Sequence, residues 1–596
     1  MKKYLALILG LCLTVGLGGC ANTPAEKTPE TQPESGNEQF DIVIVGAGGA
    51  GLAAAVEAHE QGADNILVLE KMSFAGGSTT MAFGGFNCTN SRFMDEQGKE
   101  ETPVMLVDKI IKNGAGFADV DMAGIIAMET PKVIEWLDGF GSEWGKIRYA
   151  DLHCPTDGTI PGVELVKVLK EQAEKNGIEI RYNSPAVDLI ADESGRVSGV
   201  QVKDASGEYT IDAQAVILAT GGFESNPEMI AKYDNPGLAH IHLAPSQGNM
   251  GDGIVMAEKL GAELRNMDLI QLSCAVAPFS IQMQLPIKNN GVVFINKEGK
   301  RFTNEYSEAS SDRRITEDIL KQTDAECFGV YNETIYQTFM AIEEKDFFDE
   351  YRMTGIDNSG TVVKADTLEE LAEKLGVDQE TFLATMNGLK TDNIGNEEVV
   401  KLADTYKSGP YYAVNLTPGV MDTLGGVLAD TTGRVINKEG KPIKGLYAAG
   451  EVIGNVQGAY YSVGLGEAVV FGRVSARNAI EYIKDRQGLT EHVPFDRGTP
   501  QENNAETAKG NFTDGTFTGE GQGNNGPIKV EVTVKDGSIT EIQVLEQAET
   551  PNIYAGAEEQ FIPELIKTQN LEIDAVAGAT NSSNGLREAV KNALKQ

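Results

Sequence analysis

Positive charge is scarce in this 596-residue sequence, in which 50 lysines and arginines face 88 aspartates and glutamates. The formal net charge of −38 opposes binding to nucleic acid, and it opposes binding of the protein body to anionic lipid. Histidine is scarce as well, and its five positions show no metal-ligand spacing: His59, His153, His240, His242 and His492. The sequence therefore predicts neither a nucleic-acid partner nor a metal site.

Cysteine is sparse and its spacing is irregular. Two of the six cysteines fall in the first twenty residues, and the other four are far apart, at Cys88, Cys154, Cys274 and Cys327. No C-x-x-C or C-x-x-C-H pattern occurs, which excludes a zinc ribbon, an iron–sulfur site and an attached c-type haem. We expect these four cysteines to be free, buried thiols.

The N-terminus has the pattern of an export signal. A positive start is followed by an apolar segment at residues 4–17 that is too short to span a bilayer comfortably. It ends in Leu17-Gly-Gly-Cys20, which resembles a bacterial lipobox and implies cleavage before Cys20 and lipid attachment to its sulfur. An ordinary signal peptide is the alternative. Residues 21–38 are polar and predict a disordered tether, so we expect a protein outside the cytoplasmic membrane and anchored to it.

The strongest local pattern lies at residues 41–51. It predicts a buried strand that runs through glycines into a helix, with Gly46, Gly48 and Gly51 in G-x-G-x-x-G spacing. The first glycine permits a tight turn, the second lets the backbone approach a pyrophosphate, and the third lets helix and strand pack closely. A second predicted strand ends at Glu70, about 20 residues further on, where an acid meets a ribose hydroxyl. Together these features favour a dinucleotide site over a plain strand–helix turn.

Further motifs follow in a characteristic order. They are Gly76-Gly77-Ser78-Thr79, Gly84-Gly85, Ala219-Thr220-Gly221-Gly222, Gly251-Asp252-Gly253, Gly-Lys-Arg-Phe-Thr-Asn-Glu at 299–305 and Gly-Leu-Tyr-Ala-Ala-Gly-Glu at 445–451. With these motifs, residues 38–485 resemble the flavoprotein of the fumarate reductase/succinate dehydrogenase superfamily, in its soluble single-subunit branch of fumarate and urocanate reductases. The resemblance implies an α/β fold, with a Rossmann-like FAD domain interrupted by an α+β clamp domain.

The resemblance also implies the cofactor, the boundaries and the binding residues. The cofactor is non-covalent FAD, with the FAD domain in two parts at 39–267 and 416–486 and the clamp at 268–415. The implied FAD-binding residues are Gly46, Gly48, Gly49, Ala50, Gly51, Glu70, Lys71, Gly76, Gly77, Ser78, Thr79, Gly84, Gly85, Ala219, Thr220, Gly221, Gly251, Asp252, Gly450, Glu451 and Gly466.

The composition shifts after residue 486. Residues 487–510 are polar and predict a linker, and two alternating segments around Asp536-Gly537 predict a hairpin. With Asp-Ala-Val-Ala-Gly-Ala-Thr at 574–580, residues 511–596 are similar to a small α+β domain whose FMN is joined through its phosphate to a threonine or serine. This resemblance implies covalent FMN on Thr580 and a flavin transferase as partner, although Ala577 departs from the usual Ser or Thr. A β-rich adhesive module is the alternative.

In the family, reduced FAD passes a hydride from N5 to an activated alkene, and an arginine delivers the proton. An arginine can do so only if nearby acids and a dry, closed site make its deprotonated form accessible. The matching position lies just past residue 305, where Arg313 is the first candidate and Arg314 the second. A solvated Asp-Arg-Arg turn is the alternative.

The family's dicarboxylate-binding residues are largely replaced in this chain. Ser273 and Asp422 stand where two histidines are expected, and tyrosines stand where an arginine is expected. The candidate pocket residues are Gln271, Ser273, Gln284, Leu285, Asp422, Tyr460 and Tyr461. Because a dicarboxylate such as fumarate needs several fixed positive donors, we expect a single-carboxylate or aryl-bearing enoate, such as a urocanate-, cinnamate- or acrylate-like compound. Either tyrosine could donate a hydrogen bond to a substrate oxygen or simply pack.

Two other functions stay open at this point. Tyr460-x-x-x-Gly464 followed by Leu-Gly-Glu-Ala loosely resembles the 3-ketosteroid dehydrogenase branch, in which a tyrosine hydroxyl and a glycine N–H polarise a ketone. A surface flavin carrier that only relays electrons is the other, although the intact glycine set and Glu451 oppose it. No nicotinamide site is evident, so the expected electron donor is a membrane quinol or a surface flavoprotein.

Overall fold

The structure is a computed structural model that describes residues 38–63, 65–82, 84–147, 152–205, 207–234, 242–243, 247–276, 290–306, 312–341, 357, 360–459, 463–485, 512–522, 527–547, 561–563, 565–566, 568–571 and 580–595. The predicted signal with Cys20, the tether, the linker and the positions of Gln284, Leu285, Tyr460 and Tyr461 lie outside these residues. Within them, none of the helices combines the length and the apolar character needed to cross a bilayer.

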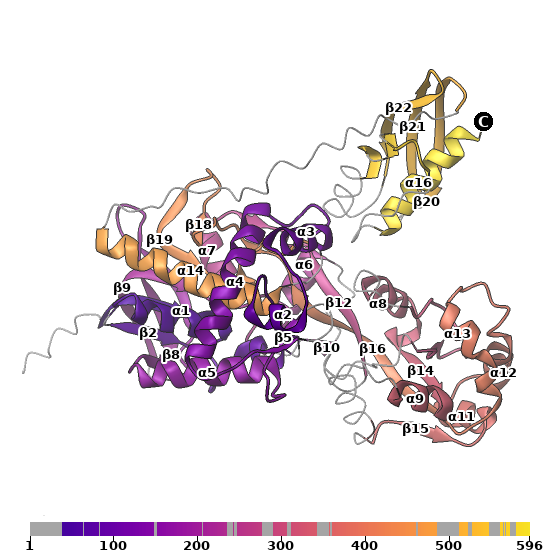
Figure 1. Ribbon diagram of the computed structural model, residues 1–596, viewed down its shortest axis with the longest axis horizontal. Coiled ribbons are helices and arrows are strands. Elements are labelled where there is room, and N and C mark those ends of the chain that lie inside the picture. Colours follow the sequence, from indigo (N-terminus) through magenta and orange to yellow (C-terminus); the bar gives the residue numbers. More distant parts are fainter. Residues whose placement is uncertain are drawn as a thin grey trace, which may run out of the picture. The chain divides into compact units, whose positions relative to one another are not determined.

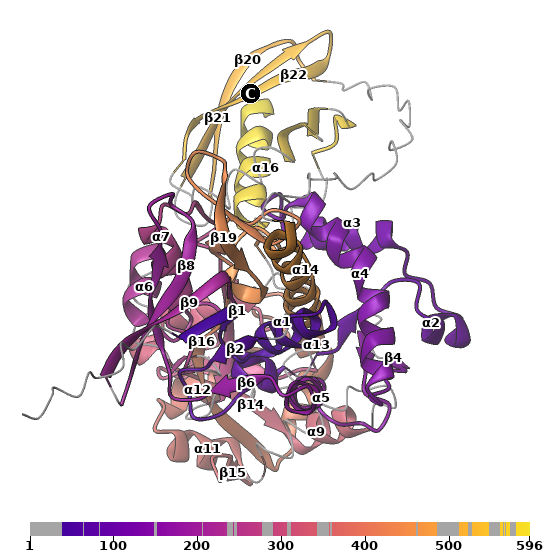
Figure 2. The same ribbon diagram turned by 90° about the vertical axis from the view of Figure 1, so that its left-hand side faces the viewer.

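A twisted sheet organises the first part of the chain. Its main path runs β18-β19-β9-β1-β2-β6, and β7 and β8 continue it from β9. The strands are β1 (Glu38–Val45), β2 (Ile66–Leu69), β6 (Glu179–Arg181), β7 (Ala186–Ala191), β8 (Val197–Asp204), β9 (Gly207–Leu218), β18 (Arg434–Ile436) and β19 (Pro442–Ala448). The pairs β1–β2, β2–β6 and β9–β19 are parallel, as a dinucleotide-binding fold requires. Figure 2 shows β1, β2 and β9 side by side.

Helices cover this sheet. They are α1 (Gly49–Glu60), α2 (Arg92–Gln97), α3 (Pro103–Asn113), α4 (Val120–Gly139), α5 (Pro161–Lys175), α6 (Pro227–Tyr233), α7 (Asp252–Lys259) and α14 (Gly464–Asp485). Short strands complete this part: β3 (Phe86–Asn87), β4 (Lys146–Ile147), β5 (Leu152–Cys154), β11 (Leu264–Arg265) and β17 (Gly426–Val427).

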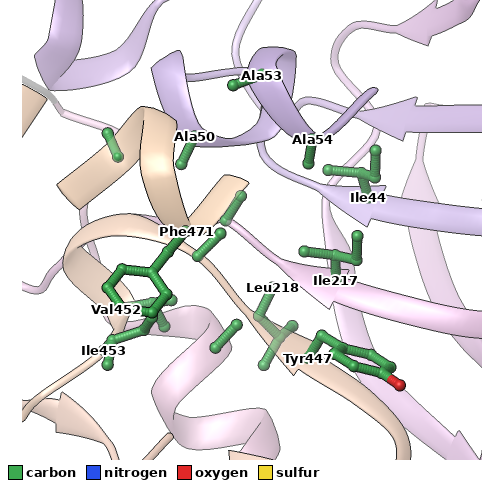
Figure 3. Packing of buried hydrophobic residues seen from close by; sticks show 14 of the residues in the cluster. Ile44, Ala50, Ala53, Ala54, Ile217, Leu218, Tyr447, Val452, Ile453 and Phe471 are labelled. Carbon is green, nitrogen blue, oxygen red and sulfur yellow. The ribbon is translucent and has the colours of Figure 1, made fainter. Parts of the chain in front are cut away.

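Helix α1 is rich in alanine because it is buried on all sides. Every residue from Gly49 to Ala58 is buried, so the helix has no solvent face to make polar. A Cβ on Gly472 of α14 would stand 2.5 Å from the Ala50 carbonyl oxygen, which shows how closely the two helices approach. Figure 3 shows the small side chains of α1 near Phe471 of α14 and Ile44 of β1, all in one hydrophobic cluster.

A second sheet carries the predicted clamp. Its strands are β10 (His242–Leu243), β12 (Ile270–Val276), β13 (Val293–Asn296), β14 (Cys327–Asn332), β15 (Val363–Ala365) and β16 (Tyr411–Thr423). The helices around it are α8 (Asp312–Leu320), α9 (Glu333–Met340), α11 (Leu368–Leu375), α12 (Gln379–Gly388) and α13 (Glu397–Leu402). Antiparallel β12 and β16 belong to both cores, because Leu272 and Val420 pack in the first cluster while Cys274 and Leu416 pack in the second (Figure 1).

The C-terminal part forms a three-stranded sheet with one long helix. It contains β20 (Gly515–Gln522), β21 (Pro527–Lys535), β22 (Ser538–Glu546) and α16 (Thr580–Leu594), around its own hydrophobic cluster. A Cβ on Gly519 would stand 2.1 Å from the Ala589 carbonyl oxygen, and one on Gly521 would stand 2.2 Å from that of Gly585. These glycines therefore let α16 lie directly on β20. The predicted hairpin and the α/β and α+β classes are confirmed.

Candidate functional site

A cavity of about 680 Å³ opens at the carboxyl ends of β1, β2, β9 and β19. Ligands of open parallel sheets bind at this edge, and the volume is in the usual range of about 300–1,000 Å³. Predicted FAD-binding residues supply much of its lining, namely Gly46, Gly48, Gly49, Ala50, Glu70, Lys71, Gly77, Ser78, Thr79, Gly84, Gly85, Ala219, Thr220, Gly221, Asp252, Gly450 and Glu451. The structure thus gathers loops that are up to 400 residues apart in sequence.

The fingerprint glycines lie where side chains have no room. Gly46 has φ +108°, and a Cβ there would stand 2.3 Å from the Ala219 carbonyl oxygen. A Cβ on Gly51 would stand 1.8 Å from the Gly46 carbonyl oxygen, so this glycine permits the packing of α1 on β1. Gly48 is the N-cap of α1 and has no side chain to cap it, and Gly49 N donates to Thr79 Oγ1 at 3.1 Å. The positive dipole end and the other N–H groups of the first turn suit a diphosphate.

Glu70 ties two parts of this turn together. Its Oε2 accepts a hydrogen bond from Ala47 N at 2.8 Å, and its Oε1 accepts one from Met72 N at 2.8 Å. The carboxylate also lines the cavity. It is therefore held rigidly at the end of β2, where it is available to a ribose hydroxyl as the sequence predicts.

Four predicted FAD-binding glycines do not line the cavity: Gly51, Gly76, Gly251 and Gly466. Gly76 (φ +131°) and Gly251 (φ +80°) turn the backbone, and a Cβ on either would stand within 2.4 Å of a neighbouring side-chain atom. A Cβ on Gly466 would make only an ordinary contact, 3.7 Å from Thr130. Gly51, Gly76 and Gly251 therefore act through the backbone, and nothing in the structure requires glycine at 466.

The cavity offers polar groups that fit a bound dinucleotide. The buried Thr220 hydroxyl lines it and has no hydrogen-bond partner within the described residues. The Lys71 ammonium is 2.6 Å from Asp252 at the rim, and both side chains are partly exposed. Glycine backbone, the N-terminus of α1, a rigid acid and an orphan hydroxyl together fit FAD.

Four carboxyl groups gather beside the glycine loops: Glu224, Asp422, Glu451 and Glu467. Burial, together with the charge of neighbouring carboxyls, raises the pKa of Glu224 and of Glu467 to about 8. Burial, and then the charge of Glu451, raises the pKa of Asp422, and burial with Glu224 raises that of Glu451.

Sequence reasoning missed Glu224, Glu467 and Asn249. A signal existed for two of them, because Glu224 lies two residues after the Gly221-Gly222 turn and Glu467 is the one charged residue in the apolar segment 464–472. Asn249 stands in a loop without a motif.

The substrate end of the cavity lies where β12 meets β16. Gln271 and Asp422 face each other across the two strands and both line the cavity. Ser273 is fully buried opposite Gly419 and does not line it. Asp422, which the resemblance predicts in place of a histidine, thus presents a carboxyl group to the cavity.

Arg313 on α8 bridges the clamp to the FAD domain. Its Nη2 donates to both carboxylate oxygens of Asp234, at 3.0 and 2.9 Å, and its Nε donates to Glu317 at 2.9 Å. Its Nη1 donates to the Ile270 carbonyl at 3.1 Å, one residue from Gln271. Burial acts to lower the pKa of the guanidinium, but Asp234 and Glu317 outweigh it and raise the pKa.

Arg314 points to different partners. It donates to Thr303 Oγ1 at 2.9 Å, to the Asn304 carbonyl at 2.7 Å and to Asp318. All of these lie in the clamp, and among the described residues no arginine lines the cavity. Of the two candidates, Arg313 is therefore the one attached to a strand that reaches the cavity.

The chain was compared with known proteins. The family described as "FAD binding domain" matches residues 41–466, and that described as "FMN-binding domain" matches residues 523–595. The chain is 34% identical to urocanate reductase of Eggerthella lenta, over 76% of this chain and 77% of that protein. It is 30% identical to fumarate reductase (cytochrome) of Shewanella frigidimarina, over 75% and 78%. The solved open conformation of a flavocytochrome c3 fumarate reductase matches with a TM-score of 0.68 at 29% identity, over 75% and 79%.

Proposed function

Because the chain belongs to the FAD-binding family of the fumarate and urocanate reductases and carries an FMN-binding domain, we propose that it reduces the C=C bond of an α,β-unsaturated monocarboxylate. The fold class, the two flavin domains and the oxidoreductase class predicted from the sequence are confirmed by these matches. One observation supports the choice of substrate: Asp422 and Gln271 face each other at the cavity wall.

Charge at the cavity wall argues against a dicarboxylate. Lys71 and Lys109 are the cationic side chains among the described residues that line it, and each is engaged by an acid, Asp252 and Glu101 respectively. A second substrate carboxylate next to Asp422 would meet a like charge or a neutral acid rather than a fixed cation. The far end of the substrate should instead donate hydrogen bonds, as an imidazole or phenol ring does, or be small and neutral, as in acrylate.

FAD bound in the cavity supplies the hydride. The chain's own residues then have to bind the enoate, exclude water and deliver a proton. We assign proton delivery to Arg313, with Arg314 as second candidate, since Arg313 contacts the Ile270 carbonyl beside cavity-lining Gln271 and its side chain is only 19% exposed. Gln271 supplies an amide that can hydrogen-bond substrate, and Tyr460 or Tyr461 is proposed to do the same.

Electron entry and location complete the proposal. We assign the lipid anchor to Cys20, which places the enzyme outside the cytoplasmic membrane, with a membrane quinol or surface flavoprotein as electron donor. Thr580, the first residue of α16, is assigned as the site of covalent FMN. A Thr580→Val variant, co-expressed with a flavin transferase, should lose the fluorescent band on a denaturing gel, whereas Ser582→Ala should keep it. Fluorescence retained in Thr580→Val would refute the attachment site.

A dye-linked substrate screen tests the function. Reduced viologen is oxidised by the purified protein in the presence of fumarate, urocanate, cinnamate, acrylate or a 3-ketosteroid enone. We expect turnover of at least one monocarboxylate and little with fumarate. Asp422→Asn should change the ranking of substrates, whereas Asp404→Asn, at an exposed position, should not. Preference for fumarate would overturn the monocarboxylate assignment, preference for the enone would favour the steroid branch, and silence across the panel would favour an electron carrier.

A further inference from the structure

Two carboxyl groups meet at the cavity wall. Glu224 follows β9 and is fully buried, while Glu451 follows β19, in a short 3-10 turn (Gly450–Val452), and lines the cavity. A Cβ on Gly222 would stand 2.5 Å from Glu451 Oε1 and 2.8 Å from Glu224 Oε2. The two oxygens therefore converge on the same glycine, which leaves room for both.

The donors around this pair are too few for two ionised carboxylates. Asn249 Nδ2 contacts Glu224 Oε1, reaches Glu451 Oε2 at 3.2 Å and Ser78 Oγ at 3.0 Å. Ser78 donates to Glu224 Oε1 at 3.2 Å, Thr423 N donates to Glu451 Oε1 at 3.2 Å, and the Gly222 backbone also donates to Glu451. Glu224 Oε2 has no donor among the described residues, although it is buried. An acceptor left in this position carries a desolvation cost unless a proton lies on it or on the facing oxygen.

No cation compensates the pair. None of the contacts that the described residues make with these two carboxyls comes from a lysine or arginine. The other charged groups that face them are also acids, Asp422 on β16 and Glu467 on α14. Like charges at this distance in a buried site cannot all ionise, and carboxyls in such pairs retain a proton.

We propose that Glu224 and Glu451 share one proton, and that Glu224 is a positioning residue that holds this proton against Glu451 where Glu451 faces the bound FAD. The pair then carries one negative charge instead of two, at a wall that has to accommodate both the diphosphate of FAD and an anionic substrate. This inference goes beyond the proposed function, since it concerns the FAD site and does not depend on which enoate is reduced.

The sign of the pH dependence follows. The pKa of Glu224 is raised from 4.5 to about 8, so the folded protein holds a proton that the unfolded chain has released. Stability from this group is complete below pH 4.5 and is lost as the pH rises through about 8. Bound FAD adds negative charge, so the carboxyl pair should hold its proton more firmly when FAD is bound. The dissociation constant of FAD should therefore rise with pH, by up to about tenfold per pH unit in the alkaline range.

The test uses full-length holoprotein and reads FAD retention, not turnover. FAD released at pH 6 to 9 is separated by ultrafiltration and quantified apart from any FMN that stays on the chain. Release should increase steeply with pH in the wild type and should be flat, within about twofold, in Glu224→Gln, whose amide donates to Glu451 at every pH. Glu467→Gln removes the other carboxyl at the cavity wall whose pKa is raised to about 8, and it should keep the steep dependence because it leaves the Glu224–Glu451 pair intact. Parallel curves for wild type and Glu224→Gln would overturn the proposal.

A spectroscopic measurement on the wild type guards against variants that fail to fold. Infrared difference spectra between pH 6 and 9 should show the loss of a protonated carboxylic C=O band. The part of that band that comes from the pair should be absent in Glu224→Gln and altered in Glu451→Gln, while Glu467→Gln should lose only the part that comes from Glu467. A wild-type spectrum with no protonated carboxyl at pH 6 would refute the shared proton.

Discussion

Replacing Arg313 with alanine should slow enoate reduction far more than it weakens the fold. A positioned proton donor contributes about 10²- to 10⁴-fold to the rate, or about 3–5 kcal/mol of barrier. The same side chain joins α8 to Asp234 by two short hydrogen bonds, and losing a charge-assisted contact of this kind costs about 1.5–3 kcal/mol of stability. The two effects differ enough to be measured separately.

Asp234→Asn is the control that separates them. It removes the ion pair and keeps the guanidinium, so it should reproduce the loss of clamp attachment but not the loss of proton delivery. It also removes one of the two charges that raise the pKa of Arg313, which makes release of its proton easier. We therefore expect Asp234→Asn to retain at least about a tenth of wild-type kcat and Arg313→Ala to fall by about 10² or more.

The assay is viologen-linked reduction of the best enoate from the screen, with kcat and KM determined separately and stability measured by urea unfolding. Arg313→Lys keeps a cation but not the forked geometry, and should fall between the alanine variant and the wild type. Arg314→Ala should alter kcat by less than about threefold, because its partners lie within the clamp. If Arg313→Ala and Asp234→Asn lose equal activity, Arg313 serves only to attach α8 to Asp234. If Arg314→Ala loses more activity than Arg313→Ala, Arg314 is the proton donor.

Two further predictions concern folding. Gly51→Ala places a Cβ 1.8 Å from a backbone oxygen, so it should destabilise the protein by about 1–3 kcal/mol and lower the FAD content after purification. The control Gly139→Ala, whose Cβ would have no atom within 4 Å, should be neutral or stabilising. Equal FAD content in the two variants would contradict the close-packing argument. Arg301→Ala should cost about 3–5 kcal/mol in urea unfolding because it strands the fully buried Glu305, to which Arg301 donates at 2.8 and 2.6 Å. The double variant Arg301→Met/Glu305→Leu should recover most of that loss, and failure to recover would mean that the pair is needed for more than charge compensation.

Local patterns in the sequence were enough for the class of protein and its flavins. The glycines of residues 41–51 encode their turn within a dozen residues, because a missing Cβ is a property of the residue itself. The hairpin around Asp536-Gly537 formed as predicted for the same reason, with Asp536 at φ +53° and Gly537 at φ +76°. Covalent attachment at Thr580 and the lipid anchor at Cys20 stay predictions.

Contacts across long stretches of chain were not readable from the sequence. The motif identified Glu451, but its partner Glu224 lies in another loop, and the amide that links them comes from Asn249. No motif specifies such a meeting, since it depends on how β9 and β19 align in the sheet. Likewise, Arg313 and Arg314 are neighbours in sequence, and only the direction of α8 determines that one reaches Asp234 and the other turns to Thr303.

The glycine cradle was therefore determined by the sequence itself, because it is encoded in short-range backbone chemistry, and the resemblance of the motifs to known families indicated the flavin-dependent class and the two flavin domains. Only the tertiary structure decided which acids share the cavity wall and which arginine lies near it. Protonation and charge depend on distances between groups that come together only when strands hundreds of residues apart pair.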